Sequence, residues 1–252
     1  MMKRGSQTGF SLVELLVGLV VSSIVLAGAF SLWKTHEVEG YRLKKKIELR
    51  NVMTMSSKRI QRSVTLAGIG LGGADNKLAR NAATGSDTLI IYTNVNGNGT
   101  PLTSNIAAGS SLIVQVADGT LFQNVSYLAV SNSNRGEIRR ITRNNGTSLE
   151  VESAFTMALN TDSSLVYPCK LERYYTDQAN NALMYENDGI ARVAAQDVKD
   201  FQVAFRDNTG APTNVSAQVS SVIFSFTGIY PAEQGALNSI VFSSTAIPRN
   251  TL

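Results

Sequence analysis

The side chain with the strongest chemical signal is Glu14, a carboxylate inside an otherwise uncharged run. The run extends from Phe10 to Trp33, and Glu14 is its single charged residue. A carboxylate costs about 2.5 to 3.5 kcal/mol at the centre of a bilayer and less near an end of the span. An ionisable residue in such a segment indicates a functional site, because it needs a partner. The alternative interpretation is a carboxylate near a helix start that reaches the membrane surface.

The remaining reactive residue types are scarce. The chain holds one histidine, His36, and one cysteine, Cys169, which excludes a Cys/His zinc site and an internal disulfide framework. His36 lies just outside the apolar run, where a general base has no evident pocket, and Cys169 is expected to be buried as a small apolar residue. Asp197 and Asp200 are expected to share a helix face as a solvated pair. We therefore predict no catalytic residue, no metal and no cofactor.

Two further motifs favour structural interpretations. Gly68, Gly70 and Gly73 spell G-x-G-x-x-G, but they follow a predicted helix, whereas a dinucleotide site needs a strand before the glycines and a helix after them. We expect the glycines to end the helix. The loop that begins at Asn94 has calcium-loop spacing, yet it has Asn at the first position and Asn105 at the twelfth, so a turn is favoured over a calcium site.

The positive charge is concentrated in one segment. The net charge is +4, and residues 34–62 carry nine basic and three acidic side chains, whereas residues 63–252 carry a net charge of −3. Three consecutive lysines, 44–46, point about 100° apart on a helix and form a collar. A collar favours contact with lipid head groups or acidic neighbours, and nucleic acid is not expected as a partner.

Hydrophobic periodicity defines the elements that position these residues. The run Phe10–Trp33 is long enough to span roughly 30 Å of hydrocarbon. Apolar residues then recur at spacings of three and four, which predicts one helix from Phe10 to about Leu66, roughly 85 Å long at 1.5 Å per residue. Beyond residue 74, short β-type runs alternate with turn signals such as Asn145-Gly146 and Asp188-Gly189, which predicts antiparallel sheet.

A secretory signal peptide is the alternative interpretation of the apolar run. Ala27-Gly28-Ala29 could serve as a small-residue cleavage site, and an exported enzyme with a mature terminus near Ser31 would result. Glu14 argues against this interpretation, because a signal peptide has no need of a carboxylate in its apolar stretch.

The segment GFSLVELLV, residues 9–17, follows a short basic leader and opens the apolar run. It resembles the prepilin signature of type IV pilins and type II secretion pseudopilins. The resemblance implies cleavage after Gly9 by a prepilin peptidase and methylation of the new terminus, Phe10. It also implies that Glu14 pairs with the amine of Phe10, its own or a neighbour's, and sets the register of assembly. The implied fold is α+β, a long N-terminal helix with a C-terminal antiparallel β-sheet head.

Weaker matches in the head point to a subclass. Residues 59–62, 86–92 and 198–205 are similar to segments of the PilW-like minor pilins and of the related J-type pseudopilins. We expect a cleaved leader at residues 1–9, a transmembrane and assembly helix at 10–33, an amphipathic helix at 34–67 that continues into the head, and a β-rich head at 68–252.

The function that the resemblance implies is a minor pilin that primes a type IV pilus or lies at its tip. Its expected partners are other pilins and minor pilins, the prepilin peptidase, the inner-membrane assembly platform and, before assembly, membrane lipid. The expected location is the bacterial inner membrane with a single span and a periplasmic head, then the pilus at the cell surface. Two alternatives stay open, a pseudopilin of type II secretion and a helix-anchored adhesin, which should carry a distinct tip domain.

Overall fold

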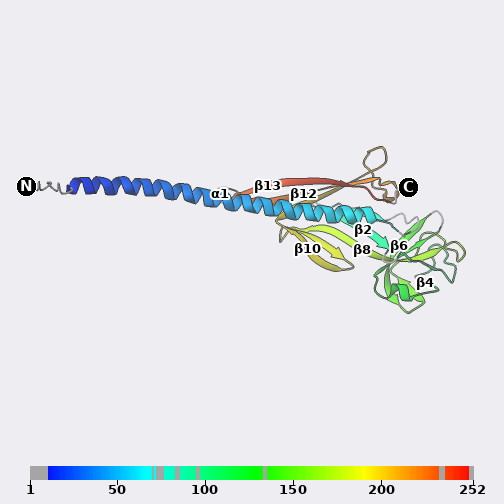
Figure 1. Ribbon diagram of the computed structural model, residues 1–252. Helices are drawn as coiled ribbons and strands as arrows, with labels where there is room; N and C mark the ends of the chain where they lie inside the picture. Colours follow the sequence, from blue (N-terminus) through cyan, green and yellow to red (C-terminus); the bar gives the residue numbers. More distant parts are fainter. Residues whose placement is uncertain are drawn as a thin grey trace, which may run out of the picture. The chain divides into compact units, whose positions relative to one another are not determined.

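The computed structural model describes residues 11–69, 71, 77–82, 86–94, 97–132, 135–232 and 236–249 (Figure 1). The chain divides into two units, residues 1–47 and 48–252. One helix, α1 (Leu12–Leu66), provides the described part of the first unit and the first element of the second. The predicted helix is thus confirmed over these residues.

The helix ends where its sequence turns to glycine. Gly68 has a φ of +71°, a conformation that favours glycine, and its N–H donates to the carbonyl of Tyr92 at 2.9 Å. The predicted helix stop is therefore confirmed at Gly68. Gly70 and Gly73 lie outside the described residues.

The rest of the second unit is built of β-strands and two short 3-10 helices. In chain order these are β1 (Leu78–Asn81), β2 (Thr88–Asn94), β3 (Thr100–Pro101), β4 (Ile113–Gln115), η1 (Thr120–Phe122), β5 (Tyr127–Ser131), β6 (Gly136–Asn144), β7 (Ser148–Val151), β8 (Leu165–Asp177), β9 (Ala182–Asn187), β10 (Ile190–Gln196), β11 (Val198–Arg206), η2 (Ser216–Gln218), β12 (Ser221–Pro231) and β13 (Leu237–Ala246). Every described strand pair is antiparallel.

Two sheets result, of ten and three strands. In the larger sheet the strand order is β1-β2-β8-β5-β6-β7-β4, with β3 and β9 also on β8 and β10 on β9. The long β8 organises this sheet, because its first residues pair with β5 and its last residues with β9. The smaller sheet has the order β11-β12-β13. The predicted fold, a long helix followed by an antiparallel head, is confirmed.

A single residue, Asp197, separates β10 in the large sheet from β11 in the small one. Asp197 has a φ of +60°, and its carbonyl accepts the N–H of Ile229 at 2.7 Å. The expectation that Asp197 and Asp200 share a helix face is wrong, because Asp200 lies in β11. Their three-residue spacing fits a helix, but the surrounding β-branched and aromatic residues fill a strand that pairs with β12.

The head has two main hydrophobic cores. The first joins the Glu48–Leu66 part of α1 to strands of both sheets. Gly228 of β12 lies directly beneath the helix, since a Cβ added there would be 2.8 Å from both Leu49 Cδ2 and Met53 Sδ. The second core consists of residues between Leu102 and Leu159, including Phe122 and Phe155, together with Val166 at the start of β8. The head therefore contains an insert, residues 102–159 between β2 and β8, with a core that is largely its own.

Candidate functional site: the N-terminal half of the long helix

The N-terminal half of α1 exposes its apolar side chains. Between Leu12 and Trp33 the fourteen large apolar residues are 53 to 79% exposed. No residue from Leu12 to Ile47, a range that the structure describes throughout, is buried. Apolar area left in water costs about 25 cal/mol per Å², so this surface calls for lipid or protein around it.

Glu14 takes part in a capping box at the start of the helix. Ser11 precedes the first helical residue, and its Oγ accepts the N–H of Val13 at 3.3 Å. Glu14 Oε2 accepts the backbone N–H of Ser11 at 3.2 Å. These two bonds satisfy backbone donors that an apolar environment would leave without partners.

This role of Glu14 escaped the sequence interpretation, although the signal was present. Ser11 and Glu14 form the S-x-x-E pattern that marks a helix start before an apolar run. The two other predicted site residues, Gly9 and Phe10, lie outside the described residues.

Two hydroxyl groups in the N-terminal half form hydrogen bonds within the helix. The hydroxyl of Ser23 donates to the carbonyl of Leu19 at 2.7 Å, and that of Thr35 donates to the carbonyl of Ser31 at 2.9 Å. Such bonds to the preceding turn allow a hydroxyl to lie in hydrocarbon. By length and composition, α1 is the one helix of the described chain that could cross a membrane, and it lies near the N-terminus.

The environments of His36 and Cys169 do not indicate a catalytic role for either residue. His36 is exposed on α1, outside the apolar run. Cys169 is a free thiol and is fully buried, as predicted. Burial raises the pKa of this thiol far above its ordinary value, which keeps it protonated and unreactive.

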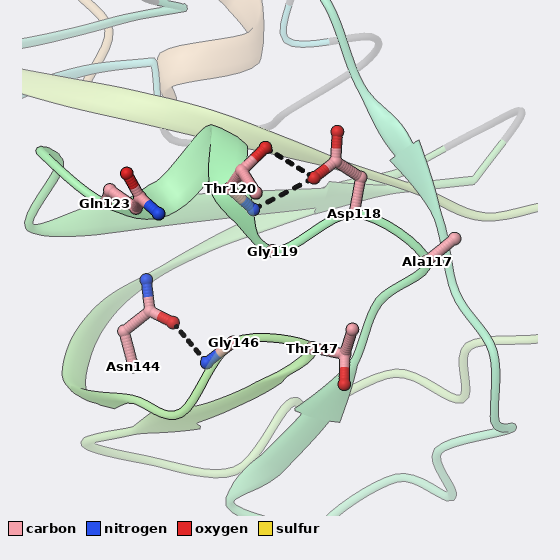
Figure 2. A pocket seen from close by; sticks show the side chains of 8 residues that line it. All are labelled: Ala117, Asp118, Gly119, Thr120, Gln123, Asn144, Gly146 and Thr147. Carbon is pink, nitrogen blue, oxygen red and sulfur yellow. Dashed lines mark hydrogen bonds between the residues drawn. The ribbon is translucent and has the colours of Figure 1, made fainter.

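An open polar depression of about 470 Å³ lies on the insert (Figure 2). Its polar groups hold the local turns. Asp118 Oδ1 accepts from the N–H and hydroxyl of Thr120 at 2.9 and 2.6 Å, which lowers the pKa of Asp118, and Asn144 Oδ1 accepts from Gly146 N–H at 3.0 Å. A Cβ on Gly119 would lie 1.7 Å from the carbonyl oxygen of Gly146, so glycine is required at this close approach. The polar groups that line the depression therefore stabilise its turns.

In the comparison with known proteins, a family model matches only the N-terminal segment of the chain. Residues 4–30 match the family model described as the prokaryotic N-terminal methylation motif. No curated protein matches the chain. Among solved structures, a type IV-like pilin from Thermus thermophilus is 9% identical, and the match covers 81% of this chain and 96% of that one with a TM-score of 0.43.

A second solved structure is the Gp54 tailspike of Acinetobacter baumannii bacteriophage AP22, in complex with a capsular saccharide of the bacterium. It is 16% identical over 32% of this chain with a TM-score of 0.28, and the match spans 15% of the tailspike. The chain thus combines a match to the methylation motif with a long helix that begins within the matched segment, at Leu12, and with an antiparallel β-sheet head.

Proposed function

We propose that this protein is a subunit of a type IV pilus, and specifically a minor pilin of the PilW-like class that acts at initiation or at the tip. The observation that carries the proposal is the exposed apolar half of α1, which begins at Leu12, inside the segment 4–30 that matches the methylation motif. The role is assembly without catalysis.

Membrane storage and assembly use the same surface. Before assembly, lipid surrounds Leu12–Trp33 in the inner membrane with the head in the periplasm, and the prepilin peptidase cleaves after Gly9 and methylates Phe10. During assembly on the inner-membrane platform, helices of other pilins replace the lipid. Gly18 and Gly28 lie in open space, so other helices can approach their backbone closely.

Glu14 has a double role in this mechanism. Within the described chain only Oε2 takes part in the capping box, which leaves Oε1 to accept a hydrogen bond from the methylated amine of a neighbouring Phe10. A charged pair of this kind is strong in an apolar bundle and costly if one partner is missing. The pairing therefore selects the axial register in which every carboxylate meets an amine.

Two substitutions separate the charge of Glu14 from its capping bond. Glu14→Gln keeps a side-chain acceptor for Ser11 N–H but removes the charge, whereas Ser11→Ala removes one capping bond and keeps the charge. We expect incorporation of E14Q into purified pili to fall by about tenfold or more, the equivalent of 1.4 kcal/mol. S11A should be incorporated nearly as well as the wild type.

The reverse result, with S11A excluded and E14Q incorporated normally, would assign Glu14 to helix capping alone. Absence of the wild-type chain from pili and from their initiation complexes would overturn the pilus role itself. Sequencing the mature N-terminus tests where the chain is cleaved. Methylated Phe10 supports the proposal, and a start near Ser31 supports an ordinary signal peptide.

A further inference from the structure

Strand β13 forms an open edge of the small sheet. It pairs with β12 over its whole length, and in the described part of the chain no strand pairs with its other side. Its ten residues include no charged side chain and no proline. Natural edge strands are normally protected by charges, prolines or covering segments, so a long neutral edge indicates a partner strand.

The opposite edge of the same sheet shows how this protein closes an edge. Beside β11, the N–H of Asp87 donates to the carbonyl of Phe201, and Asp87 Oδ2 accepts the N–H of Val203, both at 2.7 Å. The β11 edge of the small sheet is therefore covered by Asp87, whereas no strand covers the β13 edge in the described part of the chain.

Hydrogen bonds identify the backbone groups that face the open edge. The carbonyl of Thr245 accepts from the side-chain amide of Gln61 at 3.3 Å and not from β12. Ile229, which opposes Ser239, donates its N–H away from β13 to Asp197. Because orientation alternates along a strand, the odd-numbered residues of β13 present N–H and C=O groups at the edge.

From Asn238 to Ser244, the side chains of β13 are symmetric in type about Val241. If two copies align antiparallel with Val241 opposite itself, Ser239 opposes Ser243, Ile240 opposes Phe242 and Asn238 opposes Ser244. Within this range polar residues meet polar residues, apolar residues meet apolar residues, and no charge is buried, whereas Leu237 at the end of the strand would oppose Thr245. Val241 itself is 66% exposed and available for this contact.

We propose that the open edge of β13 binds β13 of a second copy of this chain, antiparallel and centred on Val241. Ser239, Val241 and Ser243 exchange backbone hydrogen bonds with their counterparts, and the two small sheets become one. Gln61 limits the pairing at its C-terminal end, because it binds Ser244 Oγ at 2.7 Å as well as Thr245. Such an interface is isologous, and it does not depend on the proposed pilus role.

Disulfide trapping of the full chain in detergent tests the contact. Val241→Cys places one thiol opposite its own copy, at a Cα separation of about 5.5 Å that a disulfide can span. The matched control is Val193→Cys on β10, which is 50% exposed and also lies on a strand with one paired side in the described chain. We expect V241C to form covalent dimers at least about tenfold faster than V193C, because pairing raises the effective concentration. The wild type is the blank, since Cys169 is buried.

The register is tested by mixing two variants. A mixture of Ser239→Cys and Ser243→Cys chains should cross-link to heterodimers, whereas each variant alone should cross-link at the control rate. Adding Ser243→Pro to V241C should return cross-linking to that rate, because proline removes an edge donor. Equal rates for V241C and V193C, or S239C alone reacting as fast as the mixture, would overturn the proposal.

Discussion

The two parts of α1 contain similar apolar residues and yet have opposite surroundings. From Leu12 to Ile47 no residue is buried, whereas the part from Glu48 to Leu66 buries Leu49, Met53, Ser56, Ser57, Ile60, Ser63 and Val64. The second part finds its partners in the head, where Leu49 and Met53 cover Gly228. Apolar periodicity therefore shows that a helix face needs a partner, and only the structure shows whether this chain supplies it.

The difference also extends to polar groups. In the second part, the hydroxyl of Ser63 shares a buried hydrogen bond of 2.9 Å with the Tyr174 hydroxyl on β8, and Ser56 donates to the carbonyl of Ala194 at 3.0 Å. In the first part, Ser23 bonds to its own helix. A hydroxyl that bonds to its own helix keeps that bond when lipid around the helix is exchanged for protein, which suits the proposed assembly role.

The largest expected effect comes from truncating the same residue type in each part. Ile60 is fully buried and Ile24 is 67% exposed. Ile60→Ala should lower the free energy of unfolding of the head by about 2 to 5 kcal/mol, because it leaves a cavity in the first core. Ile24→Ala should change it by less than about 0.5 kcal/mol. Denaturant unfolding of the full chain in micelles, followed by the near-ultraviolet signal of the head tyrosines, measures both values.

Equal losses in the two variants would show that the first part also stabilises the head, and the comparison would fail. A second readout is retention in the membrane fraction, which neither alanine substitution should abolish. The pair thus distinguishes packing inside the chain from packing outside it.

An intermediate effect is expected for the hydroxyl pair between α1 and β8. Ser63→Ala or Tyr174→Phe leaves one buried hydroxyl without its partner and should cost about 1 to 3 kcal/mol. The double variant should cost less than the sum of the two, because neither group is then left unsatisfied. Ser23→Ala is the control in the first part, and a loss there as large as in S63A would contradict the assignment. Thermal unfolding of the four variants provides the measurement.

Local features of the fold could be predicted because neighbouring residues encode them. The Asp188-Gly189 turn adopts positive φ at both residues, 48° and 85°, as the hairpin signal requires. In the Asn145-Gly146 turn only the glycine has a positive φ, 76°. The capping box of Ser11 and Glu14 is equally local, because the S-x-x-E pattern before an apolar run encodes it.

Features that depend on distant pairing could not be predicted. Leu89 of β2 pairs with Tyr174 of β8, and the insert between these strands folds around its own core. Local periodicity cannot indicate that two strands that pair in the sheet are separated in the sequence by a folded insert. The continuation of β10 into β11 through Asp197 was missed for the same reason, since tertiary pairing with β12 decides it.

The smallest expected effect is a pH dependence that belongs to the head. Burial, with a smaller contribution from Tyr127, raises the pKa of Tyr92 to about 12, and burial also raises that of Tyr174. Tyrosine in an unfolded chain ionises near pH 10, so the unfolded state binds fewer protons than the folded state above that pH. The contribution of Tyr92 to stability is complete below pH 10 and is lost as the pH rises towards 12.

Urea unfolding at pH 8 and pH 11 tests this sign. The wild-type head should lose stability between the two values, and Tyr92→Phe should lose less, because the variant has no phenol to ionise at that position. Tyr174 remains in the variant, so a residual loss is expected. If Y92F and the wild type lose equal stability, Tyr92 ionises equally readily in both states. Tyr92 packs against a small cluster of buried residues that includes Leu71 and Cys169, and this cluster would then be more open to water than the burial of those two residues implies.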